Sequence, residues 1–195
     1  MTFVGHSLTG ASLAVLVVPR AWQPTAKIAL AVGFAALANV PDFHFPSWGH
    51  ERYEISHSVF VNGGLILLAA LVLLLIPSVR TAKDAAWLLA GGGLAWLSHL
   101  LLDSFYNHGR GVLIFWPLSR ARLNLAIPWF ATLQRPLSQF RAHTARVLLI
   151  EVMVYGAVFG AALTGRFLYL KDRKCVVTTE ATGDETGVEQ KKRDS

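Results

Sequence analysis

Histidine and aspartate side chains stand at the ends of the apolar segments of this sequence, where leucine or a basic residue would be more usual. His99 and Asp103 close the segment that begins near Ala85. Residues four positions apart lie on the same face of a helix, so this imidazole and this carboxylate would point the same way. Both groups are common ligands of divalent metal ions. A polar helix end in water would explain the pair equally well, so the pair alone does not establish a site.

Further residues of the same two types recur at matching helix ends. If the apolar segments cross a membrane in alternation, six histidine and aspartate residues fall on one of its faces, at similar depth. The six are His6, Asp42, His44, His57, His99 and Asp103. Histidines with unrelated structural roles would have no reason to fall on the same face of the membrane. The sequence therefore predicts a metal site at one membrane surface.

Imidazole and carboxylate ligands without a thiolate suit zinc, with manganese or iron as alternatives. The six residues could serve one ion with supporting partners, or two ions that share a carboxylate. A bound divalent ion lowers the pKa of its water to about 7, which favours hydrolytic chemistry. A nearby carboxylate would act as general base, and we predict Glu54, with Glu51 as the second candidate. For both residues a solvated loop charge is the ordinary interpretation.

The elements that would carry these residues are membrane helices. Apolar residues make up 53% of the chain and charged residues 15%, whereas soluble domains are about a quarter charged. A helix needs roughly 20 mainly apolar residues to cross a bilayer. The sequence predicts an all-α, polytopic membrane helix bundle of about five spans. The expected spans are 8–18, 28–40, 57–76, 85–103 and 147–170.

Two segments differ in composition from the expected spans. Residues 104–144 mix tryptophan, proline and arginine, which suits the headgroup level, and we expect one or two interfacial helices there over one mouth of the bundle. From Lys171 onward the composition is polar and predicts a disordered tail. The expected organisation is a membrane-embedded helical domain at 1–170 and a disordered polar tail at 171–195.

The formal charge of +6 does not indicate a nucleic-acid-binding protein. The tail from Lys171 holds six basic and six acidic residues, so the positive excess lies in the membrane part, mostly near helix ends. Basic residues there are explained by snorkelling and by membrane topology. The expected partners are membrane lipid and a lipid-like substrate that reaches the site by lateral diffusion, and no nucleic acid is expected.

Five short motifs occur in a fixed order between residues 2 and 119. They are Gly5-His6-Ser7-Leu8-Thr9-Gly10, Asn39-Val40-Pro41-Asp42-Phe43-His44, Ser56-His57-Ser58, His99-Leu100-Leu101-Leu102-Asp103 and Gly111-Val112-Leu113-Ile114-Phe115-Trp116-Pro117. As a set they resemble the LexA-regulated, inner-membrane metal-dependent hydrolase family. The resemblance implies a multi-pass protein of the cell inner membrane and a metal-dependent hydrolase.

The chain departs from that family's pattern at two places. His44 stands where the family has a second Asp, and Arg52-Tyr53-Glu54 stands where it has His-Arg-Gly, with His50 as the nearest histidine. The main alternative is therefore a non-catalytic membrane protein whose metal site is structural or sensing. A transporter or proton relay is a weaker alternative, because it would spread titratable residues through the depth of the bilayer.

Overall fold

The structure is a computed structural model that describes residues 1–49, 52–106, 111–133 and 142–193. Within these residues it contains seven α-helices and one short 3-10 helix, and its only strand-like pairing is an isolated bridge between Val112 and Leu123. The elements in chain order are α1 (Phe3–Val17), α2 (Pro24–Leu37), η1 (Val40–Asp42), α3 (Tyr53–Ser56), α4 (Val59–Leu74), α5 (Pro77–Arg80), α6 (Ala85–Ser104) and α7 (Ala142–Arg193). The predicted all-α class is confirmed.

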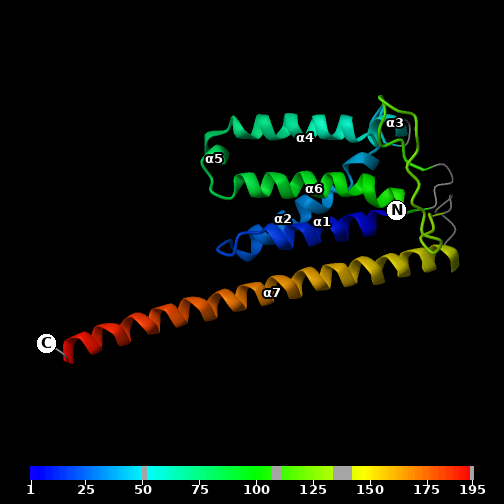
Figure 1. Ribbon diagram of the computed structural model, residues 1–195. Helices are drawn as coiled ribbons and strands as arrows, with labels where there is room; N and C mark the ends of the chain where they lie inside the picture. Colours follow the sequence, from blue (N-terminus) through cyan, green and yellow to red (C-terminus); the bar gives the residue numbers. More distant parts are fainter. Residues whose placement is uncertain (50–51, 107–110, 134–141, 194–195) are drawn as a thin grey trace.

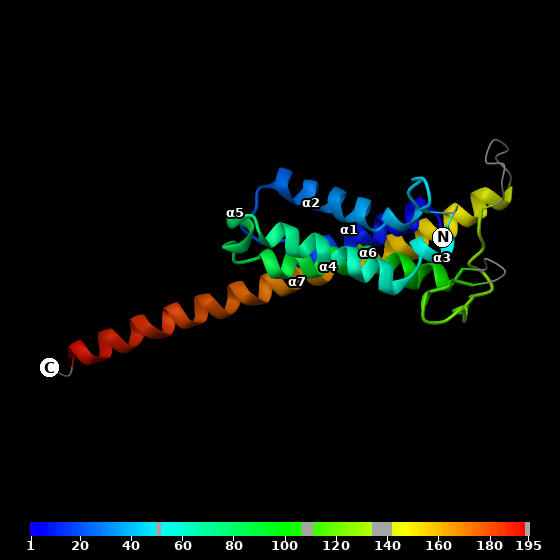
Figure 2. The ribbon, with the colours of Figure 1, turned by 90° about the horizontal axis from the view of Figure 1, so that it is seen from above.

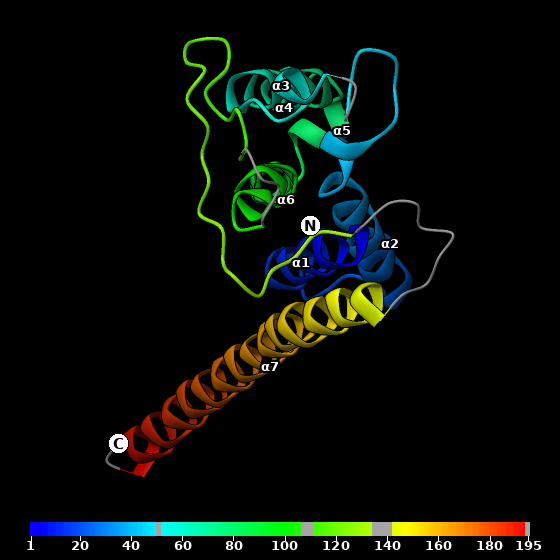
Figure 3. The same ribbon diagram turned by 90° about the vertical axis from the view of Figure 1, so that its right-hand side faces the viewer.

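The five long helices run lengthwise beside one another and alternate in direction along the chain (Figure 1). As a result, α1, α4 and α7 begin at the end of the bundle where α2 and α6 finish (Figures 1 and 2). Helix α1 packs against α2, α6 and α7, whereas α4 packs against α6 on the other side (Figure 3). This alternation gathers the polar helix ends of the sequence at one end of the bundle.

The crossing of α1 and α2 depends on a glycine. A Cβ atom on Gly10 would lie 2.3 Å from the carbonyl oxygen of Phe34 and 2.9 Å from the Cα of Ala35. Small residues allow helix backbones to approach this closely in membranes. Beside the crossing, Ala14, Phe34 and Ala95 form a buried apolar cluster that joins α1, α2 and α6.

Only two helices in the described part of the chain are long and apolar enough to be candidate membrane spans. They are residues Ala85–Ser104 and Ala142–Lys171. Helices α1, α2 and α4 are apolar but have only 14 to 16 residues. At 1.5 Å per residue they reach about 21–24 Å, short of a hydrocarbon core of about 30 Å. The prediction of about five spans is therefore not confirmed.

The segment between α6 and α7 is irregular where the structure describes it. Residues 105–106 and 111–133 contain no helix, so the predicted interfacial helices are wrong for these residues. Pro117 and Pro128 lack the backbone N–H that a helix interior requires. The backbone instead pairs with the ends of other elements. The N–H groups of Leu125 and Ile127 donate to the carbonyls of Ser104 and Phe105, at 2.8 and 2.9 Å.

Helix α7 continues beyond its apolar part to Arg193. The sequence predicts a disordered tail here, and the structure differs by giving this segment a helical backbone (Figure 1). Residues 171–193 contain no proline, so no residue there forces the helix to end. The division into a membrane-embedded domain at 1–170 and a tail at 171–195 stays a prediction.

Candidate metal centre

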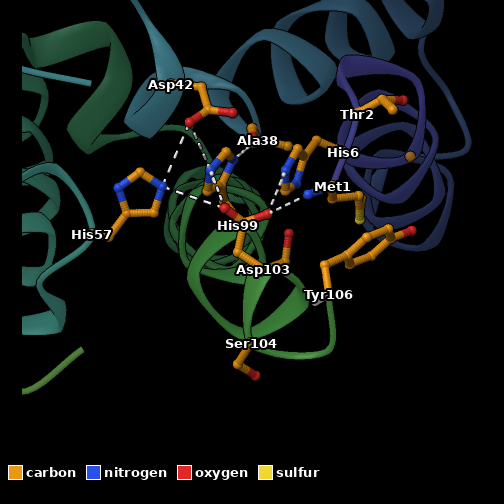
Figure 4. Close-up of polar contacts among 12 residues, drawn as sticks. Met1, Thr2, His6, Ala38, Asp42, His57, His99, Asp103, Ser104 and Tyr106 are labelled. Carbon is orange, nitrogen blue, oxygen red and sulfur yellow. Dashed lines mark hydrogen bonds and ion pairs between the residues drawn. The ribbon is translucent and has the colours of Figure 1, made fainter. Parts of the chain in front are cut away.

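Four of the predicted ligands meet at the polar end of the bundle. Asp42 ends η1, His57 lies between α3 and α4, and His99 and Asp103 lie one turn apart on α6. Each offers one nitrogen or oxygen atom, and the four atoms lie within 4.8 Å of one another (Figure 4). His57 and His99 are fully buried and Asp103 is 2% exposed, whereas the Asp42 side chain is 27% exposed. Together they are a candidate site for one metal ion, and we call these four residues the metal centre.

The distances in the metal centre resemble those between ligands of one ion. The Nε2 atom of His57 lies 3.5 Å from Asp42 Oδ1 and 3.4 Å from Asp103 Oδ2. The Nε2 atom of His99 lies 3.6 Å from each of the same two oxygens. An N–H···O hydrogen bond is shorter, at about 2.7–3.2 Å. Ligands about 2.1 Å from a tetrahedral ion are about 3.4 Å apart, close to the observed values.

The imidazole of His99 is held in the form that can bind a cation. Its Nδ1 atom lies 2.8 Å from the carbonyl oxygen of Ala38, the residue that caps α2. A carbonyl oxygen only accepts hydrogen bonds, so Nδ1 carries the proton and the Nε2 of the neutral ring presents a lone pair. This Nε2 is buried and has no hydrogen-bond partner in the described part of the chain. Histidine ligands of metals are commonly oriented in this way.

His57 is held in the same form by a chain of two hydrogen bonds. The Ser56 hydroxyl donates to the carbonyl of Gly49 at 2.9 Å, and its oxygen lies 2.7 Å from His57 Nδ1. Because the single hydroxyl hydrogen is used on Gly49, Nδ1 of His57 must donate to Ser56, and in the neutral ring Nε2 is the acceptor nitrogen. The ring of Tyr53 stacks on the His57 imidazole at 3.8 Å between centroids.

Asn62, in the first turns of α4, holds the backbone on both sides of His57. Its amide nitrogen donates to the carbonyls of Ser56 and Ser58 at 2.8 and 2.7 Å. Its amide oxygen accepts the indole N–H of Trp96 at 2.7 Å. The sequence marks Asn62 only as the one strongly polar residue of an apolar segment. Its function could not be predicted, because it acts on backbone carbonyls.

The electrostatics of the metal centre favour positive charge. Burial alone would lower the pKa of His57, but the carboxylates of Asp103 and Asp42 outweigh burial and raise this pKa above its usual value. Burial alone would likewise raise the pKa of Asp42, but the imidazoles of His57 and His99 hold it well below its usual range. The two carboxylates therefore favour positive charge beside them, either on His57 or on a bound cation.

His6 lies beside the metal centre and contacts the other oxygen of Asp103. Its Nε2 atom is 3.3 Å from Asp103 Oδ1, and its ring stacks on that of His99 at 3.7 Å between centroids. It is fully buried, and neither ring nitrogen makes a hydrogen bond within the described residues. The N-terminal ammonium of Met1 donates to the same Asp103 oxygen at 3.0 Å (Figure 4).

The structure does not bring the remaining predicted site residues into the group of four. His44 lies exposed in the loop after η1. Glu54 is 34% exposed and accepts a hydrogen bond from Arg52 Nε at 2.9 Å. A backbone hydrogen bond, followed by this arginine, lowers the pKa of Glu54. The roles of His44 as ligand and of Glu54 as base stay predictions. His50 and Glu51 lie outside the described residues.

Comparison with known proteins places the chain in a family. No curated protein and no solved structure shows significant similarity to it. A family model matches residues 1–170, a range that includes the metal centre, His6 and Asn62. This match supports the predicted inner-membrane family. It does not test the hydrolase activity or the LexA regulation that the resemblance implied. The chain belongs to the YdjM inner membrane protein family.

Proposed function

We propose that this membrane protein binds one divalent cation at the metal centre and uses it to hydrolyse an ester or phosphoester of a lipid-like substrate. The observation that carries the proposal is the buried Nε2 of His99, which lies 3.6 Å from two carboxylate oxygens and makes no hydrogen bond in the described part of the chain. A buried polar atom without a partner costs about 1–3 kcal/mol, and a bound cation would remove this cost.

The donor set suits zinc, manganese or iron, because it combines two imidazoles with two carboxylates and has no thiolate. A divalent ion bound there would lower the pKa of a coordinated water to about 7 and so supply a nucleophile at neutral pH. The Asp42 side chain is the exposed member of the group, so water and substrate would arrive past this residue. The position at one end of the bundle fits a substrate that lies in the membrane.

Other residues of the chain would position these ligands. The Ala38 carbonyl and the Ser56 hydroxyl fix the protonated nitrogen of His99 and of His57, and His6 approaches the second oxygen of Asp103. Glu54 is the carboxylate that we assign as general base. Its pairing with Arg52 makes it a weak base, so its proton transfer would require the ion pair to open.

One observation favours the alternative of a structural or sensing metal site. Four protein ligands complete the shell of a tetrahedral zinc ion, and structural zinc sites are closed in this way. A six-coordinate manganese or iron ion would keep two positions for water and substrate with the same four ligands. The identity of the bound metal therefore separates the two functions.

The first experiment measures metal content in the full chain purified in detergent. We expect one divalent ion per chain in the wild type, and loss of that ion in His99→Ala. His44→Ala is the matched control, because His44 lies outside the group of four, and it should keep the ion. Unchanged stoichiometry in His99→Ala would overturn the metal centre, and loss of the ion in His44→Ala would restore His44 as a ligand.

The second experiment measures hydrolysis of phospholipid vesicles. The wild-type protein is stripped of metal and then supplied with zinc, manganese or iron. Turnover that returns with one metal, and that stays absent from His99→Ala supplied with the same metal, would support the hydrolase. A wild type that retains its metal and releases no product from carboxylic or phosphoric esters would favour the structural or sensing function instead.

A further inference from the structure

An apolar groove lies between α2, α4 and α6, with a volume of about 230 Å³. Its walls include Leu37 of α2, Ile66 and Ala70 of α4, and Gly92 and Trp96 of α6. All of its lining residues among those described are apolar, and the indole N–H of Trp96 is already bonded to Asn62. Such walls offer nothing to an ion, a sugar or a free phosphate, but they suit a hydrocarbon chain.

The glycines of α6 give the groove its width. A Cβ atom on Gly93 would lie 3.1 Å from Ile66 Cγ2, and one on Gly92 would lie 3.3 Å from Leu37 Cδ1. Larger side chains at these two positions would occupy the space between α6 and its neighbours. Small residues permit close helix packing in membranes, and the groove lies alongside Gly92 and Gly93.

The groove and the metal centre lie on one continuous stripe of α6. Leu89, Gly92 and Trp96 line the groove at intervals of three and four residues, and the same spacing leads on to His99 and Asp103. Trp96 is therefore about 4.5 Å along the helix axis from His99.

The neighbouring helices show the same continuity. On α2 the lining residues Phe34 and Leu37 are followed by Ala38, whose carbonyl holds His99. On α4 the lining begins with Ile66, one turn after Asn62, whose amide fixes the backbone beside His57. The hydrogen bond between Asn62 and Trp96 thus stands at the boundary between the apolar groove and the polar centre.

We infer that the groove holds one acyl chain of a membrane lipid, and that the lipid's ester headgroup then lies at the metal centre; the second half of this inference rests on the proposed function. From Leu88 to Trp96 the lining of α6 extends about 12 Å. A hydrocarbon chain needs no hydrogen-bonding partner, and the apolar walls of the groove offer none. Leu73, at the end remote from the centre, is 40% exposed, so a chain can enter from the surrounding lipid.

The test uses the full chain in vesicles that contain phosphatidylglycerol with a diazirine at the middle of one acyl chain. After illumination, the cross-linked peptides are identified by mass spectrometry. We expect them to come from the groove faces of α4 and α6. Ala70→Phe fills the groove and should lower this cross-linking roughly tenfold, the effect of displacing about two buried methylene groups. Ala90→Phe is the matched control, because Ala90 is exposed on α6 and does not line the groove.

Cross-links spread evenly over the exposed surfaces of α4, α6 and α7, and unchanged in Ala70→Phe, would overturn the inference. Metal content is measured on each variant, and if Ala70→Phe loses its ion, Leu73→Trp takes its place at the remote end of the groove. The cross-linking is repeated on His99→Ala. If the wild type binds no metal and shows no turnover but its groove is still labelled, the acyl-chain site stands and the proposed hydrolase is wrong. Failure of the acyl-chain site and failure of the hydrolase are therefore distinguishable.

Discussion

The backbone N–H of Thr2 donates to the carboxylate of Glu151 at 2.8 Å, and the Thr2 hydroxyl donates to its second oxygen. Both residues are buried, so this contact fixes the start of α1 against α7 and holds His6 one turn further along. Glu151→Ala removes both acceptors and leaves a buried N–H without a partner. We expect it to lower the free energy of unfolding by about 1–3 kcal/mol, measured by denaturant titration in detergent.

The matched variant for this contact is Glu151→Gln. Its side-chain oxygen can still accept the Thr2 N–H, and its amide group can donate to the Thr2 hydroxyl oxygen. We therefore expect Glu151→Gln to unfold at higher denaturant concentration than Glu151→Ala. Equal stability of the two variants would show that the hydrogen bonds from Thr2 do not account for the burial of Glu151.

The other end of α1 is held by Arg166 of the same helix α7. The guanidinium donates to the carbonyls of Val18 at 2.6 Å and Leu16 at 3.4 Å, which satisfies acceptors at the helix end. Glu151 and Arg166 are separated by about 22 Å along α7, close to the length of α1 between its two contacts. Arg166→Ala should lower the free energy of unfolding by about 0.5–1 kcal/mol. In the same titration, Arg80→Ala, on the exposed surface of α5, should leave it unchanged.

The positions of histidine and aspartate along the sequence predicted which end of the bundle would gather a group of possible metal ligands. This prediction depends only on apolar segments that alternate in direction, and it brought His57 and His99 together with Asp42 and Asp103. The same pattern could not distinguish these four residues from His44. Asp42 and His44 are two positions apart in an irregular segment, so their side chains can point in different directions. The groups that orient the ligands carry no sequence signal either, since the carbonyls of Ala38 and Gly49 belong to the backbone.

The fold was predicted less completely than the site. Hydropathy found every long helix, because apolar composition alone indicates them. It could not give helix lengths, since Pro19 and Pro41 limit the first two apolar segments while leaving their composition unchanged. For residues 111–133 the tryptophan and arginine content predicted a helix at the membrane surface. Proline and the pairing of this backbone with Ser104 and Phe105 produced an irregular segment instead.

The α1–α2 crossing should tolerate no side chain at Gly10. Gly10→Ala places a methyl group against the carbonyl of Phe34, so the helices must separate and the cluster of Ala14, Phe34 and Ala95 loosens. We expect a loss of about 1–3 kcal/mol in unfolding free energy.

Gly33→Ala on α2 is the control for Gly10→Ala, because a Cβ there meets nothing within 4 Å in the described part of the chain. This control should be neutral or stabilising by up to about 1 kcal/mol, because alanine favours helix. Equal losses in both variants would assign the effect to the helix backbone and not to the crossing.

Asn62 should control the affinity of the metal centre without touching the ion. Asn62→Leu removes the two donors that hold the carbonyls on either side of His57, and removes the acceptor for Trp96. Loss of a residue that orients a metal ligand typically weakens metal binding by about 10–100-fold, and we expect this weakening in a competition titration with a chelating dye.

Trp96→Phe separates the loss of the indole contact from the loss of the backbone contacts, because it removes only the indole donor and leaves Asn62 bonded to Ser56 and Ser58. Metal affinity close to wild type in Trp96→Phe, with weak binding in Asn62→Leu, would assign the effect to the backbone beside His57. Equal weakening in both variants would instead assign it to the packing of α4 against α6.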